Sequence, residues 1–495
     1  MSDTEETRLR FFSILARVEF ACAACLLSLV LILGPYANIQ LASRAASLGL
    51  LAMGLVLLAV LVSRPWSALG NQLARQLENT GPLRLLVVGM AIQFTFAWLT
   101  SPALVSDMKA YLGLAAKLAQ GERYVDSQGF LAFLPPGLPF ALTPFVALFG
   151  PGLLAVTVAN AVFFAVGGWG IWSITIRLLG SATARLAVLF YCLWPSRWFS
   201  AGLASKENLT FAMMVAGIAF ALAAVDARAR KPKSAAFFSG AAFGLATLAQ
   251  PGLQLFLLAA PLFLRHSMAR LGLRTFVARL AIIFIASLLV TVPWQLRNCK
   301  VFNGTFCGVA TNGGSVFYRA NNPKATGSWI PVGEVPLGHL SELEQNRVGF
   351  ELGKQWIHEN PAQMLRLSAR KLISLLGSDD YGAYWGIFRG TGLSDEQSAR
   401  NNLPLRVAMY ETGRFVSLSY WIVIAALGLR ALWEHRAILS VAGQAWLPLV
   451  YPLLYCGAVF AVFESGSRQH IVAVGPLLVL AAAGAINNSR ARSRA

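Results

Sequence analysis

A single carboxylate, Asp107, follows a long apolar segment that ends at Thr100. From Met108 to Gln120, apolar side chains share one face of a predicted helix, and Lys109 and Lys117 take the other. This pattern predicts a helix that lies on a membrane surface. A carboxylate held just outside the hydrocarbon could act as a general base on a lipid-borne substrate. An acid at a helix start also fits ordinary N-capping, which is the simpler interpretation from the residues alone.

Two further groups of charged residues stand next to apolar runs and are expected on the same side of the membrane as Asp107. Lys206 and Glu207 stand where one such run begins. They are either a snorkelling lysine with a helix-start acid, or a pair that meets an anionic substrate or a metal. Arg468 and His470 directly precede the last apolar run, where charges are costly unless they are paired or functional.

The residues that could bind a metal are poorly spaced for it. Cys22 and Cys25 form a CxxC inside an apolar run, with no other ligand nearby, so we interpret them as packing residues. His358 has no His or Cys at ligand spacing. Asp379 and Asp380 are adjacent, so their side chains point in different directions, and we expect a solvated turn. The sequence therefore does not identify a metal site. A divalent cation remains one alternative for a cofactor.

Two cysteines on the expected external side are predicted to pair. Asn303-Gly304 is a turn signal between β-prone residues. A hairpin loop over Phe302, Asn303 and Gly304 would set Cys299 opposite Cys307. We therefore predict a disulfide there, provided that this side is an oxidising compartment.

The composition indicates a polytopic α-helical membrane protein. Of the 495 residues, 56% are apolar and 13% are charged, and long apolar runs recur along the chain. The run 137–149 is too short to cross comfortably and is expected to be interfacial or re-entrant. About twelve spans are expected near residues 12–34, 45–63, 84–101, 152–176, 183–200, 207–225, 234–250, 251–264, 275–296, 412–432, 442–463 and 470–487.

The net charge of +19 does not indicate a nucleic-acid partner, because the Lys and Arg residues cluster in short loops between apolar runs. These loops fall on one side together with both termini, and the positive-inside rule makes that side cytoplasmic. The first apolar run lacks a clear cleavage site and is expected to be a retained helix.

This topology divides the chain into four parts. Residues 1–83 are N-terminal membrane helices, and 84–296 form a transmembrane core with a catalytic external loop at 101–150. Residues 297–410 are expected to form a mixed α/β external domain. The last part, 411–495, holds C-terminal membrane helices and a basic cytoplasmic tail.

In order and spacing, several motifs resemble those of a known family. They are Asp107…Tyr111…Gly121…Pro135-Pro136-Gly137-x-Pro139…Phe149-Gly150, Ser205-Lys206-Glu207, Gln250-Pro251, Trp294-x-x-Arg297-Asn298, Thr311-Asn312-Gly313-Gly314…Asn321-Asn322-Pro323-x-Ala325-Thr326-Gly327, Trp356-Ile357-x-Glu359-Asn360-Pro361 and Arg468. The chain resembles the bacterial GT-C fold membrane glycosyltransferases of the protein-mannosyltransferase-like and aminoarabinose-transferase-like group. The motifs cover about residues 84–487.

The resemblance implies transfer of a sugar from a polyprenyl-phosphate donor to an acceptor hydroxyl, with inversion, at the periplasmic face of the inner membrane. It implies Asp107 as the general base, and a glycolipid, polysaccharide or protein as the acceptor. Glu207 would orient a lysine or help to hold a metal. The donor phosphate would bind Arg297, Lys206 and Arg468, in a cavity or loop with Tyr111, Pro136, Asn312 and Tyr318.

The sequence departs from the family pattern at several points. Gln250 stands where the family often has Arg, and Met108 replaces the second acid that follows the first in eukaryotic protein mannosyltransferases. Two other functions fit the residues: a transporter or flippase of lipid-linked sugar, and an inactive relative that binds glycolipid. Charges that collect on the external face, with no half-to-half repeat, favour the enzyme.

Overall fold

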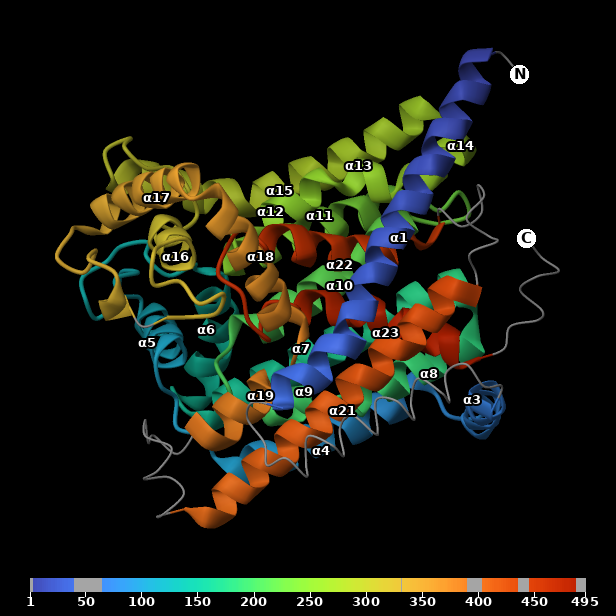
Figure 1. Cartoon of the computed structure of the whole chain (residues 1–495), viewed down its shortest axis with the longest axis horizontal. Coiled ribbons are helices and arrows are strands. Elements are labelled where there is room, and N and C mark those ends of the chain that lie inside the picture. The colour runs from blue at the N-terminus through green and yellow to red at the C-terminus, as the bar shows by residue number, and fades with distance from the viewer. Residues whose placement is uncertain (1–2, 40–64, 331, 390–402, 435–444, 487–495) are drawn as a thin grey trace.

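The computed structural model describes residues 3–39, 65–330, 332–389, 403–434 and 445–486, and they are mostly helical (Figure 1). The helices before residue 200 are α1 (Asp3–Ile39), α3 (Pro65–Gln76), α4 (Pro82–Thr100), α5 (Asp107–Ala119), α6 (Gly137–Phe149), α7 (Leu153–Leu179), α8 (Ser181–Cys192) and α9 (Pro195–Phe199). Those up to residue 301 are α10 (Lys206–Ala224), α11 (Pro232–Ala249), α12 (Leu253–Leu258), α13 (Ala260–Phe263), η1 (Arg265–Ser267), α14 (Met268–Leu271) and α15 (Leu273–Val301). The remainder are α16 (Gly313–Ala320), η2 (Val332–Glu334), α17 (Glu342–Glu359), α18 (Pro361–Leu376), α19 (Tyr381–Ala383), η3 (Tyr384–Phe388), α21 (Pro404–Glu434), α22 (Leu447–Phe460) and α23 (Ile471–Ala485).

Within the described ranges, six helices are long and apolar enough to cross a membrane. They lie in α1, α4, α7, α10, α15 and α21. The expectation of about twelve spans is not confirmed. The span expected over 251–264 is divided into α12 and α13, with Pro261 in the first turn of the second helix. The span expected over 45–63 lies outside the described residues.

Helix α23 forms the centre of the apolar bundle. All of its residues from Ile471 to Ala485 are buried, which is expected of a helix that is apolar all round. It contacts α21, α22, α10 and α8, and Figure 1 shows it within the crossing helices. The loop that precedes it, which carries Arg468, is therefore anchored directly to the core.

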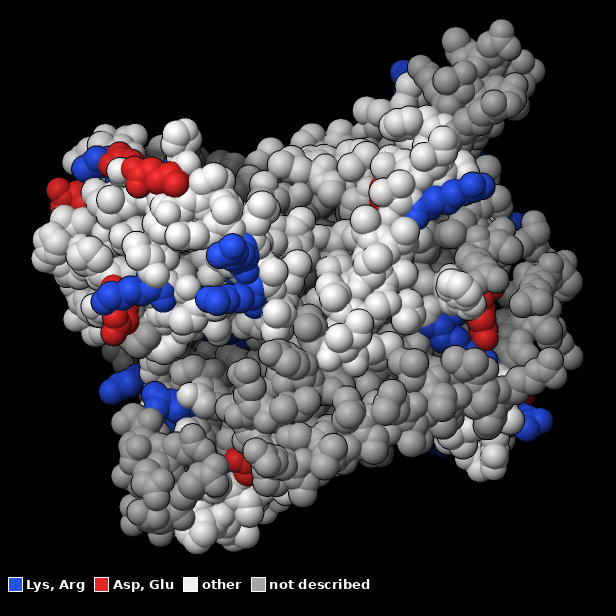
Figure 2. Space-filling view, viewed as in Figure 1, with Lys and Arg blue, Asp and Glu red and all other residues white. Residues whose placement is uncertain are grey.

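The described charged side chains are spread unevenly over the visible face. On the face in Figure 2, the described Lys, Arg, Asp and Glu side chains gather toward the two ends of the molecule. The described surface between them is almost uncharged in Figure 2. Helix α15 carries exposed apolar side chains such as Ile285, Leu288 and Leu289. An uncharged band between two charged zones is the pattern that a bilayer selects.

Helices α5, α16 and α17 gather at one end of the bundle (Figure 1). The described part of 297–410 contains helices and turns without a strand, so the expected mixed α/β domain is not observed. The predicted hairpin was wrong for a local reason: α15 continues to Val301 and already includes Cys299. Asn303 and Gly304 take left-handed conformations, with φ of 50° and 80°, and turn the chain where that helix ends.

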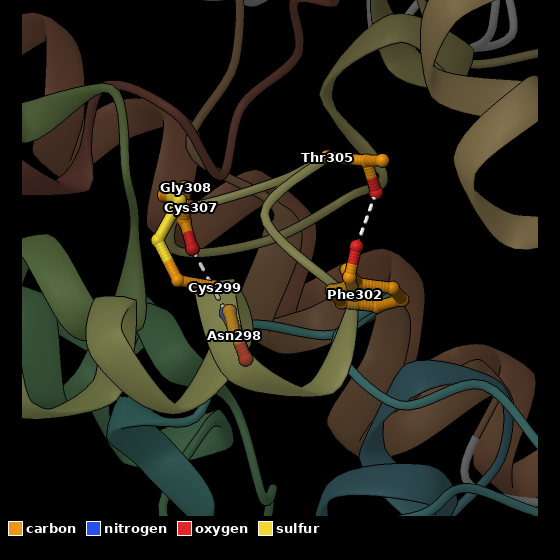
Figure 3. The surroundings of a disulfide bond; sticks show 6 residues. All are labelled: Asn298, Cys299, Phe302, Thr305, Cys307 and Gly308. Atoms are coloured by element: carbon orange, nitrogen blue, oxygen red, sulfur yellow. Dashed lines mark hydrogen bonds between the residues drawn. A yellow bond between two sulfur atoms is a disulfide. The ribbon is translucent and has the colours of Figure 1, made fainter.

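The turn after α15 is closed by a disulfide (Figure 3). Cys299 and Cys307 are bonded, with a Cα–Cα separation of 4.4 Å. Next to them, the Asn298 side-chain amide donates a hydrogen bond of 2.8 Å to the Gly308 carbonyl. The returning chain is thus attached to the last turn of the helix by a covalent bond and a hydrogen bond.

Candidate functional site

A cavity of about 650 Å³ opens where α5, α10, α16 and the loop between α22 and α23 meet. Its lining contains three cations and three carboxylates, contributed by four separate parts of the chain. They are Lys206, Arg319 and Arg468, and Asp107, Glu207 and Glu464. A cavity that collects ionisable groups at the end of an apolar bundle is the natural candidate for a functional site.

Asp107 is the first residue of α5, and its side chain is 55% exposed. The residue at the N-cap is Ser106, so the capping role considered for Asp107 is not what the structure shows. Its Oδ2 lies 3.8 Å from Nη1 of Arg468, close enough for charge attraction but too long for a hydrogen bond. The carboxylate is therefore accessible from the cavity.

Arg468 is held by several carboxylates. Its Nη2 donates a hydrogen bond of 3.1 Å to Oε1 of Glu464. Burial by itself would lower the pKa of Arg468, but the nearby charges of Glu207, Glu464 and Asp107 raise it overall. The side chain is 26% exposed, so a fixed positive charge faces the cavity.

Glu207 lies buried in the first turn of α10, where the positive end of the helix dipole favours an acid. Ser205 Oγ donates a hydrogen bond of 2.6 Å to its Oε2, and Tyr381 Oη donates one of 3.1 Å to Ser205. Tyr111 of α5 lies nearby, and burial, followed by the charges of Asp107 and Glu207, raises its pKa. Tyr111 is therefore a neutral hydrogen-bond donor at the cavity wall.

A buried polar network fixes the turn that carries Lys206 and Glu207. The Asn160 amide of α7 donates to the carbonyls of Ala201 and Leu203 at 2.8 and 2.9 Å. Asn208 donates to Asn160 Oδ1 at 3.1 Å and accepts a hydrogen bond from Arg197. Because these polar groups are buried, their hydrogen bonds specify one position for the turn.

Glu342 of α17 connects the first loop, between α5 and α6, to the turn before α16. Its carboxylate accepts hydrogen bonds from the backbone N–H groups of Leu131 and Ala132, at 2.7 and 2.8 Å. It also accepts one of 2.6 Å from Thr311 Oγ1. The polar side of the cavity is built here, since Asn312 follows Thr311 in the chain, and Gln128 and Gln345 also line it.

Arg297, expected at the donor phosphate, and Pro136 and Tyr318, expected in a cavity or loop, do not line this cavity. Both terminal nitrogens of Arg297 donate to backbone carbonyls, to Leu131 at 2.7 Å and to Tyr124 at 3.1 Å. Arg297 therefore supports the first loop and does not line the cavity with Lys206 and Arg468. Pro136 is buried at the N-cap of α6, and Tyr318 packs against a small apolar cluster with Ile330 and Val335.

The expectation of a solvated turn at Asp379 is wrong. Asp379 is fully buried, and it accepts a hydrogen bond of 2.6 Å from Trp194 Nε1. Its Oδ1 lies 3.2 Å from Nε2 of His470. Burial raises its pKa, although these partners oppose the shift. His470 also stacks on Trp421. This network anchors the segment that carries Arg468, two residues earlier.

The sequence alone did not predict Arg319 and Glu464 as residues of the site. Arg319 stands in an ordinary polar stretch, and Glu464 is an isolated acid after an apolar run. The one available signal was that Glu464 lies four residues before Arg468, a spacing at which ion pairs form in helical turns.

The described residues do not gather three or more His, Cys, Asp or Glu side chains that could hold a metal ion. Asp107 and Glu207 are both close enough to Arg468 to raise its pKa. Arg468 therefore supplies a positive charge close to both carboxylates.

Residues 134–295 match the family described as dolichyl-phosphate-mannose-protein mannosyltransferase. The resemblance to membrane glycosyltransferases is confirmed. The matched residues include Lys206, Glu207 and Gln250, and they end before the external helices. A search of curated proteins found no significant match.

Two solved structures are similar in part. The archaeal oligosaccharyltransferase AglB from Archaeoglobus fulgidus has 9% identity and a TM-score of 0.46 over 82% of this chain, which spans half of the archaeal protein. ArnT from Cupriavidus metallidurans has 17% identity and a TM-score of 0.40, over 81% of this chain and 76% of its own. Both TM-scores lie below 0.5, so these likenesses assign no function to the chain.

Proposed function

We propose that this membrane glycosyltransferase moves a sugar from a polyprenyl-phosphate donor to an acceptor hydroxyl, with inversion. The observation that carries the proposal is the open carboxylate of Asp107 beside the fixed cation Arg468, in a cavity at the end of an apolar bundle. A base next to a phosphate-binding cation is the pair of groups that such a transfer needs.

The proposed reaction gives each of these groups a role. Asp107 accepts the proton of the acceptor hydroxyl while its oxygen forms a bond to the anomeric carbon. The bond from that carbon to the phosphate oxygen breaks, and the phosphate leaves with the electron pair. Arg468 and Lys206 stabilise the negative charge that develops on it, the arginine through the planar N–H donors that suit phosphate oxygens.

The two ends of the cavity suit different substrates. Leu255, Val459 and Phe460 line an apolar part next to α12 and α22, which suits the donor's polyprenyl chain. Gln128, Asn312 and Gln345 line a polar part near α16 and α17 that suits the acceptor, in which we include a glycolipid, a polysaccharide or a protein.

We place the enzyme in the inner membrane, with both termini in the cytoplasm and the cavity on the periplasmic side. The basic loops support this orientation through the positive-inside rule. The Cys299–Cys307 disulfide supports it as well, because disulfides persist in oxidising compartments.

The test compares wild type with Asp107→Asn in membranes. The assay follows the release of free polyprenyl phosphate from a pool of polyprenyl-phosphate sugars, with a crude cell-envelope lipid extract as acceptor. Loss of a general base should slow release by about 100-fold or more. Glu122→Gln is the matched control, because Glu122 is an exposed acid of the same loop, and it should keep wild-type activity.

Equal release by Asp107→Asn and wild type would move the base elsewhere, with Glu207 as the next candidate. No release by any of the proteins, across several donor sugars and acceptor extracts, would contradict the transferase proposal.

A further inference from the structure

Arg319 brings a second guanidinium to the cavity from a different part of the chain. It belongs to α16, one of the external helices, whereas Arg468 belongs to the loop before α23. Nη2 of Arg319 lies 3.1 Å from Oε2 of Glu464, and Nη2 of Arg468 lies 3.1 Å from Oε1 of the same carboxylate. The Glu464 side chain is only 4% exposed, so one buried acid joins two arginines.

Glu464 alone does not neutralise both Arg319 and Arg468. Glu464 balances one of the two guanidinium groups. Glu207 and the more exposed Asp107, at 3.8 Å, are the other acids near Arg468. Each guanidinium has five N–H donors. Glu464 contacts only one terminal nitrogen of each arginine. Both side chains line the cavity, so an anion there can meet donors of both.

We propose that Arg319 is a second phosphate-binding residue of the donor site, placed next to Arg468 by their shared partner Glu464. This inference rests on the proposed function, because it concerns the same donor phosphate. A leaving phosphate gains negative charge as the sugar bond breaks, and two planar guanidinium groups distribute that charge over several oxygens.

The pairing also has a structural consequence. Because Arg319 comes from the external helices and Arg468 from the loop before the central helix α23, a phosphate bound to both joins these two parts. The external helices would then contribute to binding of the donor itself.

The test measures binding of undecaprenyl phosphate to the purified full-length chain in detergent, from the ligand-induced rise in unfolding temperature. Undecaprenol, which lacks the phosphate, is the neutral comparison. Arg319→Ala should weaken the affinity for undecaprenyl phosphate about tenfold or more, and Arg319→Lys should weaken it less, because lysine keeps the charge but loses the planar fork. Affinity for undecaprenol should not change.

Arg347→Ala is the matched control. Arg347 lies on the external helix α17 and pairs with Glu351 one turn away, with both side chains exposed. Its loss should leave both affinities unchanged. An Arg319→Ala protein that binds undecaprenyl phosphate within twofold of wild type would overturn the proposal, and so would an equal loss of undecaprenol binding, which would indicate a packing role.

This experiment needs neither an acceptor nor turnover, so its outcome is separate from the transfer assay. Binding that depends on Arg319 in a protein without transferase activity would support the phosphate site and contradict the proposed function. Transfer that depends on Asp107, with binding indifferent to Arg319, would do the reverse. A wild-type chain that does not bind undecaprenyl phosphate would contradict both.

Discussion

At the scale of single residues, the partners of a charged side chain decide whether it serves the scaffold or the site. Arg297 and Arg468 both lie at the ends of apolar segments. The terminal nitrogens of Arg297 donate hydrogen bonds to backbone carbonyls of the first loop. Arg468 instead donates one described hydrogen bond, to Glu464, and keeps a side chain that is 26% exposed to the cavity. Arg297 therefore supports the first loop, whereas Arg468 is available to a ligand in the cavity.

Lys371 of α18 provides a prediction at this scale. It is buried, and it donates hydrogen bonds to Val462 O at 2.7 Å and Asn321 Oδ1 at 2.9 Å. Burial lowers its pKa from 10.5 to about 8. Between these values the unfolded chain binds more protons than the folded one, so stability should rise with pH in that window.

Lys371→Met should lack this pH-dependent gain. The measurement is the unfolding temperature in detergent from pH 7.5 to 10, for both proteins in parallel. The wild type should gain stability relative to the variant as the pH passes 8, whatever the offset between the two at neutral pH. Parallel profiles would show that Lys371 does not titrate in this window.

At the scale of elements, the site depends on helices that are far apart in the sequence. Helix α5 supplies Asp107, α10 supplies Glu207 and α16 supplies Arg319. Glu342 of α17 connects two of these regions, because it binds the first loop at Leu131 and Ala132 as well as Thr311.

Glu342→Gln should loosen the first loop. An amide keeps the volume but replaces one accepting oxygen by a donor, so at least one of the three donors loses its partner. We expect a loss of about 2 kcal/mol in unfolding free energy and faster proteolysis within residues 120–135. Glu351→Gln, at an exposed ion pair, is the control and should change neither. An unchanged proteolysis rate in Glu342→Gln would contradict the proposed connection.

At the scale of the whole molecule, the disulfide provides a test of both stability and orientation. Cys299 and Cys307 close a short loop at the end of α15, on the side of the cavity. Replacing both by serine should lower the free energy of unfolding by about 2–3 kcal/mol, as measured by thermal unfolding. The main reason is that the unfolded chain gains conformational entropy when the crosslink is removed.

The same pair reports the compartment. Intact-mass analysis of freshly prepared protein, with thiols blocked before reduction, should find the four other cysteines free and this pair protected. Two further blocked thiols, at Cys299 and Cys307, would place the cavity on the reducing side of the membrane and contradict the proposed orientation.

The sequence by itself determined the class of protein and the local elements of the site. Apolar runs must satisfy their backbone groups within helices, so they predict a membrane bundle regardless of how it packs. The surface helix after Asp107 followed from its two-faced pattern, and the structure has it as α5. These predictions depend on neighbours along the chain, which a sequence contains.

Only the tertiary structure decided which charges meet. Arg319 and Glu464 lie 145 positions apart (464 minus 319), and nothing local distinguishes them. Asp379 was expected in solvent because adjacent acids usually are, but it is buried by Trp194 and His470, both distant in the chain. The energy of a charge depends on burial and on partners across the fold, and packing alone sets both.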